Sequence, residues 1–280
     1  MLQVELDIFS GRPNPKWILT PNDERKMVDR IQSDPSLVIP ASTRVGGLGY
    51  RGYIIEVLKD AETRKGANHS SLPQSFRIGG GNNKDASLWL LDTSEKDNPE
   101  VDNHLREITD KAIRNPDKEA VSNVNKGLMM SCANSYLTSS TDFSPWNVAP
   151  YISSNNCYDF AGNCRYSSYN FAQPGRHSGY TLTFPPNCSN TTTGIQSDGW
   201  FNVCQSANNL SIALVIWPGQ DFHFYRVCQN DIWCHKPGNT PARNYDNSNN
   251  LIYNPQTCDR GPYTQFCGYW YANNSLIIVS

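Results

Sequence analysis

The sequence predicts an α+β protein with two domains, a charged domain without cysteine followed by a disulfide-rich domain. Charge density changes sharply along the 280 residues: 36 of the first 120 are Asp, Glu, Lys or Arg, against 14 of the last 160. All nine cysteines lie in the second part, from Cys132 to Cys267. Strand and helix patterns occur in both parts without a regular alternation, which is typical of α+β folds. We therefore expect domains at residues 1–118 and 125–280, with a boundary within 115–130.

The first domain is predicted to begin with a half-buried strand at residues 2–9, where apolar and polar side chains alternate. A rigid loop, Ser10–Trp17, follows, because its two prolines fix the backbone and provide no N–H donor. Asn and acidic residues then open a helix at about residues 21–32. The remaining elements, two strands and then two helices, are expected at residues 50–58, 75–78, 84–94 and 100–114.

The second domain is predicted to combine a short helix with an antiparallel meander. Asn156 is a favoured N-cap residue, which would place the Cys157 sulfur at the positive end of a helix dipole, where the pKa of a thiol falls. The meander is indicated by apolar strands that are separated by turn residues such as Pro218-Gly219. The three strands of the meander are expected at residues 211–217, 221–228 and 232–236. An earlier strand is expected at residues 179–184 and a final strand at residues 275–279.

The composition excludes several classes of function. The net charge is −2, so no basic face for nucleic acid is expected. No apolar run of about 18 residues is present, which argues against a membrane span. The start of the chain lacks a basic and apolar leader, so we expect a mature chain without its signal peptide. Cysteine density and sequons favour a secreted glycoprotein, with candidate glycosylation sites at Asn68, Asn187, Asn190, Asn209 and Asn273.

Nine cysteines leave one thiol over when eight of them pair. Cys157 is the best candidate for the odd thiol because of its position at a predicted helix start. The alternative is that Cys157 forms a disulfide with Cys132 or Cys188. Cys228 and Cys234 stand on facing strands of a tight hairpin, so we expect a disulfide between them.

A cysteine nucleophile needs a base within hydrogen-bond reach and a group that orients the base. Two of the five histidines, His223 and His235, stand on neighbouring strands of the predicted meander. We expect His223 to be the base, with His235 or Asp246 as the orienting group. The alternatives are that the imidazoles are structural, or that both bind zinc with a cysteine, although their spacing matches no known zinc motif. We predict neither a metal nor a cofactor.

The order of these residues resembles that of papain-like cysteine hydrolases, and most closely the NlpC-type peptidases. In that family a Cys at a helix start precedes strands joined by a tight glycine turn, which Asn156-Cys157-Tyr158 and the stretch 212–219 match. The resemblance implies a papain-like second domain. The family places its histidine at the start of the first strand, at about Leu210 or Ser211, and neither residue is a base. Either His223 has taken over this role, or the site is catalytically silent.

The whole chain also resembles a family of secreted two-domain proteins. The shared features are the motif Phe-Ser-Gly-Arg-Pro-Asn-Pro-x-Trp at Phe9–Trp17, an Asn-Cys-Tyr segment, and Trp-x-His-Lys-Pro-Gly at Trp233–Gly238. This resemblance implies two extracellular domains and no particular activity. The candidate binding residues lie in or near these motifs, at Arg12, Trp17, Arg226, Trp233 and Lys236.

Two functions therefore remain open. The first is a secreted cysteine hydrolase that cleaves an amide bond in a peptide or a cell-wall crosslink, with Cys157 as nucleophile and His223 as base. The second is a non-catalytic extracellular protein that binds a glycan or a protein partner on a disulfide-stabilised scaffold.

Overall fold

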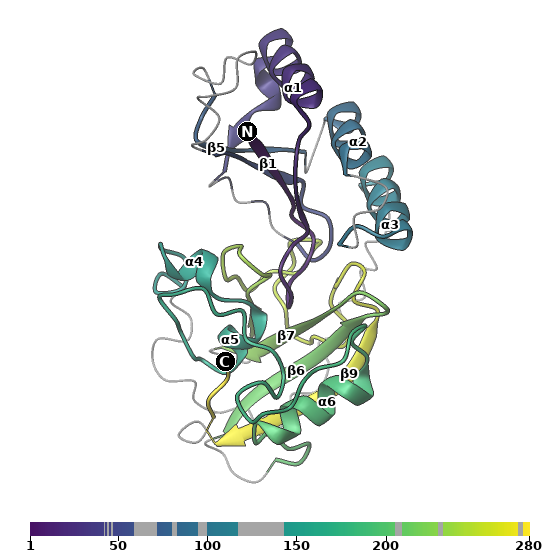
Figure 1. Ribbon diagram of the computed structural model, residues 1–280. Coiled ribbons are helices and arrows are strands. Elements are labelled where there is room, and N and C mark those ends of the chain that lie inside the picture. Colours follow the sequence, from purple (N-terminus) through teal and green to yellow (C-terminus); the bar gives the residue numbers. More distant parts are fainter. Residues whose placement is uncertain are drawn as a thin grey trace. The chain divides into compact units, whose positions relative to one another are not determined.

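Two antiparallel sheets, each accompanied by helices, make up the fold (Figure 1). The α+β class is therefore confirmed. The computed structural model describes residues 1–41, 43, 45, 47–58, 72–79, 83–94, 100–116, 143–204, 209–228, 232–273 and 277–280, without the side chains of Asn209 and Asn273. The chain divides into two compact units. The first comprises Met1–Ile8, Asn14–Val45 and Tyr50–Lys118, and the second comprises Phe9–Pro13, Gly46–Gly49 and Glu119–Ser280.

The first unit is built on a five-stranded antiparallel sheet with the order β2-β1-β4-β5-β3. Its strands are β1 (Leu2–Leu6), β2 (Lys16–Ile18), β3 (Ile39–Pro40), β4 (Tyr53–Val57) and β5 (Ser75–Ile78). Its helices are α1 (Pro21–Ser33), the 3₁₀ helix η1 (Pro35–Leu37), α2 (Lys84–Thr93) and α3 (Asn103–Arg114). α1 begins one residue after Thr20, whose hydroxyl accepts a hydrogen bond from Asp23 N, so the cap is Thr20.

A buried ion cluster fixes the end of β1 to its neighbours in the first unit. Asp7 Oδ1 accepts hydrogen bonds from Arg51 Nε at 3.0 Å and Nη2 at 2.7 Å. Asp7 Oδ2 accepts from both terminal nitrogens of Arg77. All three residues are at most 4% exposed. Removing the single carboxylate would therefore leave two buried guanidinium groups without their shared acid.

The second unit contains a four-stranded antiparallel sheet with the order β8-β7-β6-β9. Its strands are β6 (Asn209–Trp217), β7 (Asp221–Val227), β8 (Trp233–His235) and β9 (Gln265–Asn273). Its helices are α4 (Tyr151–Ser154), α5 (Cys157–Ala161) and α6 (Cys188–Ser197). α5 packs on β7 and α6 packs on β9 (Figure 1).

Strand alternation separates an apolar face from a polar face in this sheet. Leu214 and Phe224 pair across β6 and β7 and belong to the core on which Tyr158 of α5 packs. His223 and Tyr225 lie at the intervening positions of β7, so their side chains point to the opposite face. This second face is also buried, because every residue of β7 is buried.

Several expected elements are absent or differ. Residues 179–184 form no strand, and the apolar end of the chain, Ile277–Ser280, is described without a strand. It packs as extended chain instead, with Val279 O accepting from Tyr166 Oη at 2.7 Å. β9 and α6 were not expected. α6 is rich in Ser, Thr and Asn, which have low intrinsic helix propensity. Nor does a single cut near residue 118 describe the division, because Phe9–Pro13 and Gly46–Gly49 group with the second unit.

Candidate functional site

Cys157 stands at the start of α5, as the sequence suggests. The N-cap residue Asn156 accepts hydrogen bonds from the backbone N–H groups of Tyr158 and Asp159. The Asp159 carboxylate accepts from Asn156 N at 2.9 Å and completes a capping box. α5 is only five residues long, so few peptide dipoles align behind the sulfur. The thiol forms no disulfide and is completely buried.

The surroundings of Cys157 favour the neutral thiol. Burial raises its pKa well above the usual value, and the negative charge of Asp221 raises it further. Hydrogen bonds from the Phe224 backbone and the Ser10 side chain lower it only in part. The Sγ atom lies 3.9 Å from Phe222 O, to which a protonated thiol donates. Because the thiolate is the nucleophilic form, this cysteine is poorly suited to attack a substrate at neutral pH.

The two predicted histidines meet in a buried hydrogen-bonded chain. His223 Nε2 lies 2.9 Å from His235 Nδ1, and His223 Nδ1 lies 2.5 Å from Ser10 Oγ. If His235 Nε2 donates to Tyr245 O, at 3.0 Å, neutral rings make the Ser10 hydroxyl a donor to His223. If His235 Nε2 instead accepts from Arg243 Nε, at 3.2 Å, every donor in the chain reverses. With either polarity the Ser10 hydroxyl is hydrogen-bonded to His223, and the same hydroxyl partly offsets the raised pKa of the Cys157 thiol.

Asp221 anchors the segment that carries Ser10. Its Oδ2 atom accepts from Ser10 N at 2.6 Å, Gly11 N at 3.1 Å and Tyr263 Oη at 2.6 Å. Burial nevertheless raises the pKa of this carboxyl group, although these hydrogen bonds and the charge of Arg12 oppose the shift. The backbone of the segment is thus held at a buried carboxylate on β7.

We call Phe9–Pro13 the head segment. Its Gly11 carbonyl accepts hydrogen bonds from Asn156 Nδ2 at 2.8 Å and Gln173 Nε2 at 3.0 Å. A Cβ atom on Gly11 would lie 2.4 Å from a ring carbon of Phe222, so only glycine allows this approach. Arg12 donates to Gln220 O at 3.2 Å. The head segment therefore lies between the start of α5 and β7, with bonds to both.

Asp246 does not fill the orienting role that we expected for it. Its Oδ1 atom accepts from Asn250 N at 2.9 Å and its Oδ2 atom from Asp259 N at 3.1 Å. These bonds close the loop after residue 245. The groups near His235 Nε2 are instead the backbone oxygen of Tyr245 and Arg243 Nε.

The five candidate binding residues are mostly internal. Trp17 is 7% exposed and donates from Nε1 to a hydroxyl of α2. Arg226 is 2% exposed, and its guanidinium lies 3.8 Å from the centre of the Phe160 ring. Lys236 is completely buried, and its Nζ atom donates to three backbone carbonyls at 2.6–2.7 Å. Arg12 and Trp233 are half-buried. Their main contacts are thus within the fold.

The sequence gives no local sign of the roles of Ser10, Asp221 and Tyr263. Ser10 lies in the Phe9–Trp17 motif, but its partner His223 is 213 positions away in the chain. The only available signal was the glycine at position 11, which indicates a close approach of the backbone. Within the described residues, no group of three or more His, Cys, Asp or Glu side chains is arranged to hold a metal ion.

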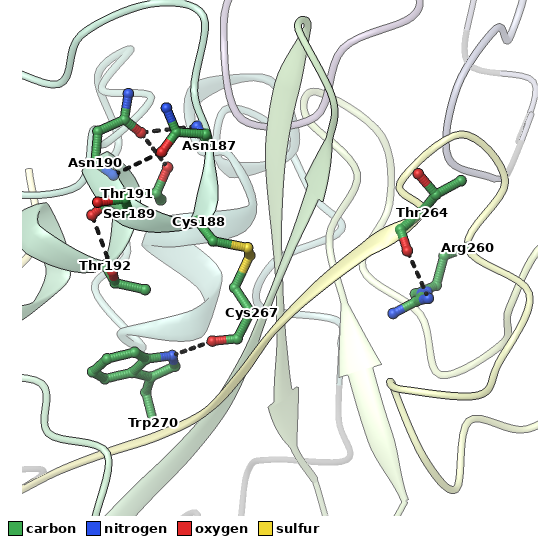
Figure 2. Close-up of a disulfide and its surroundings, with 10 residues drawn as sticks. All are labelled: Asn187, Cys188, Ser189, Asn190, Thr191, Thr192, Arg260, Thr264, Cys267 and Trp270. Carbon is green, nitrogen blue, oxygen red and sulfur yellow. Dashed lines mark hydrogen bonds between the residues drawn. A yellow bond between two sulfur atoms is a disulfide. The ribbon is translucent and has the colours of Figure 1, made fainter.

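Disulfides link the second unit at several points. Cys188 at the start of α6 is bonded to Cys267 of β9 (Figure 2). Cys228 is bonded to Cys234, and Cys204 is also disulfide-bonded. Among the described cysteines three thiols remain unbridged, Cys157, Cys164 and Cys258, which is more than the single odd thiol expected.

Two of the five candidate glycosylation sites are described with their side chains. Asn68 and the side chains of Asn209 and Asn273 lie outside the described residues. Asn187 and Asn190 lie at the start of α6.

Among the described residues no helix has the length and apolar character needed to cross a membrane.

Fold and site together define an α+β protein with a buried Cys–Ser–His–His centre beneath its own head segment. No protein-family model matches the chain, and no solved structure does. The chain is 41% identical over 139 residues to the insoluble matrix shell protein 1 of Ruditapes philippinarum, a match that covers 46% of this chain and 88% of that protein. The chain therefore belongs to the family of this insoluble matrix shell protein.

Proposed function

We propose that this protein is a non-catalytic structural constituent of an insoluble extracellular matrix. One observation carries the proposal: Cys157, His223 and His235 are all completely buried, and the head segment is bonded to this centre. A hydrolase needs its nucleophile in contact with substrate. In this protein the same residues serve as an internal clamp that holds the head segment.

The groups that would polarise a substrate carbonyl are also engaged. In an acyl-transfer site, donors near the nucleophile stabilise the developing oxyanion. Here the side-chain amides of Asn156, next to Cys157 in the chain, and of Gln173 both donate to the carbonyl of Gly11. Together with the raised pKa of Cys157, this favours the silent form of a papain-like centre over an active one.

The proposed location rests on the relative and on the disulfides. The relative is named as a protein of an insoluble shell matrix. Disulfides such as Cys188–Cys267 persist in oxidising, extracellular surroundings. Exposed aromatic side chains offer contacts to matrix peptides or glycans, because aromatic rings combine a large apolar surface with a polar edge. These are Tyr169, Tyr245 and Tyr253, at 62%, 45% and 41% exposure.

Fractionation of the tissue that secretes the protein tests this proposal. Antibodies against the chain should detect it in matrix that remains insoluble after chelator and urea extraction. Recombinant wild-type protein and the Cys157→Ala variant should co-sediment equally with that matrix, since the thiol has no catalytic task. Detection only in soluble extracts would reject the structural role. So would amide hydrolysis by the wild type that the Cys157→Ala variant lacks.

A further inference from the structure

The start of α6 carries two sequons within six residues, Asn187-Cys188-Ser189 and Asn190-Thr191-Thr192. Sequence alone does not distinguish them, since each satisfies the acceptor pattern. The two asparagines form a reciprocal capping box, which Figure 2 shows across the first turn of the helix. Asn187 Oδ1 accepts from Asn190 N at 3.0 Å, and Asn190 Oδ1 accepts from Asn187 N at 2.8 Å. Both oxygen atoms therefore have structural tasks.

The two amide nitrogens, where a glycan would attach, differ. Asn190 Nδ2 donates to Thr183 O at 2.7 Å and to Pro185 O at 3.3 Å, and the residue is half-buried. Asn187 is exposed, and within the described part of the chain its Nδ2 atom donates no hydrogen bond. Only Asn187 can therefore lose an amide hydrogen without losing a contact of the fold.

We propose that Asn187 carries an N-linked glycan and that Asn190 remains unmodified in the folded protein. The proposal rests on the extracellular location given under the proposed function. The donor is a lipid pyrophosphate-linked oligosaccharide of the secretory pathway. The bond from Asn187 Nδ2 to the anomeric carbon of the sugar forms, the bond from that carbon to the pyrophosphate oxygen breaks, and one amide proton leaves with the lipid pyrophosphate.

A glycan at Asn187 is compatible with the helix start. The cap uses only the oxygen of the Asn187 amide, which glycosylation leaves in place, and the residue is exposed. A glycan at Asn190 would leave a single hydrogen on Nδ2 for two carbonyl partners. It would also force a sugar ring against Thr183 and Pro185, whose oxygen atoms lie within hydrogen-bond distance of that nitrogen. A chain modified at Asn190 could not close this turn.

Site occupancy in the secreted protein tests the proposal. The full chain, secreted from a eukaryotic host behind a signal peptide, is treated with peptide N-glycosidase in heavy-oxygen water. Mass spectrometry of the peptide that spans both sequons then locates the labelled aspartate. We expect label at position 187 in most molecules and none at position 190. Label at position 190, or at neither position in the secreted protein, would overturn the proposal.

Two matched variants each remove one of the two sequons, and both variants keep the two asparagines in place. Ser189→Ala should abolish the glycan of this helix, because Ser189 is the hydroxyl residue of the Asn187 sequon. Thr192→Ala should leave the glycan unchanged. A glycan that survives Ser189→Ala and disappears in Thr192→Ala would assign it to Asn190 and refute the proposal. Occupancy is measured on secreted recombinant protein, so the absence of a glycan at Asn187 would reject the glycosylation proposal without rejecting the matrix role. Failure of the matrix fractionation with Asn187 occupied rejects only that role.

Discussion

Replacing Gly11 by Ala directly tests the placement of the head segment against Phe222. A Cβ atom at this position would lie 2.4, 2.6 and 2.7 Å from three ring carbons of Phe222, a completely buried side chain. Ordinary carbon contacts lie near 3.5 Å, so the segment must move by roughly 1 Å. Such a shift stretches the hydrogen bonds of 2.6 and 3.1 Å that Ser10 N and Gly11 N donate to Asp221.

Two effects contribute to the expected loss of stability in Gly11→Ala: overpacking against Phe222 and weaker hydrogen bonds to Asp221. Overpacking a buried site costs about 1–3 kcal/mol, and a hydrogen bond to a charged group contributes about 1.5–3 kcal/mol. We expect Gly11→Ala to lower the free energy of unfolding of the second unit by about 3 kcal/mol. In scanning calorimetry this corresponds to a fall in Tm of roughly 6–12 °C.

Two further variants make the test specific. Gly219→Ala places a Cβ atom with nothing within 4 Å, at a φ of +76°, so it reports only backbone strain of about 1–2 kcal/mol. Phe222→Leu removes ring carbons from the clash, so the double variant Gly11→Ala, Phe222→Leu should be more stable than the sum of the single changes predicts. A Gly11→Ala protein within about 0.5 kcal/mol of wild type would refute the placement of the head segment.

Three other perturbations have defined outcomes. Lys236→Met leaves three buried carbonyls without their donor and should destabilise the second unit by about 3 kcal/mol, seen as a lower urea midpoint with an unchanged m value. Burial raises the pKa of Asp221 in the folded state, so ionisation of this carboxyl group weakens the fold as the pH rises above its usual pKa of 3.8. In Asp221→Asn the Tm measured from about pH 4 upward should lose that decline, and a steeper decline would contradict the assignment. Replacing both Cys188 and Cys267 by Ser should cost about 2–5 kcal/mol in the second unit, while the transition of the cysteine-free first unit stays in place in the same calorimetric scan.

Local sequence patterns identify the elements that have a strong period or a clear stop signal. The meander was expected at residues 211–217, 221–228 and 232–236, and the strands lie at Asn209–Trp217, Asp221–Val227 and Trp233–His235. Apolar runs between turn residues carry this information. α6 has no such signal, because Ser, Thr and Asn dominate it, and its helix depends on the capping box and on the disulfide at Cys188. The apolar end of the chain, in contrast, fills the core without joining a sheet.

The candidate site was predictable only where its parts are close in sequence. His223 and His235 lie on adjacent strands of one hairpin, and the register Tyr225↔His235 brings their rings together. Ser10 comes from the other end of the chain, and no local pattern reports a contact across 213 positions. For the same reason the sequence predicts a thiol of lowered pKa at Cys157. The burial of Cys157, which keeps the thiol neutral, follows from the packing of the whole second unit.

Thiol labelling of the native protein tests the central claim most directly. The folded full chain is treated with iodoacetamide at neutral pH, and peptide mapping follows the rate at Cys157, Cys164 and Cys258, the unbridged thiols among the described cysteines. A structural centre predicts that Cys157 stays unlabelled while the partly exposed Cys164 reacts, and that all three react in denaturant. Rapid, selective labelling of Cys157 in the folded protein would contradict the account and restore the cysteine hydrolase.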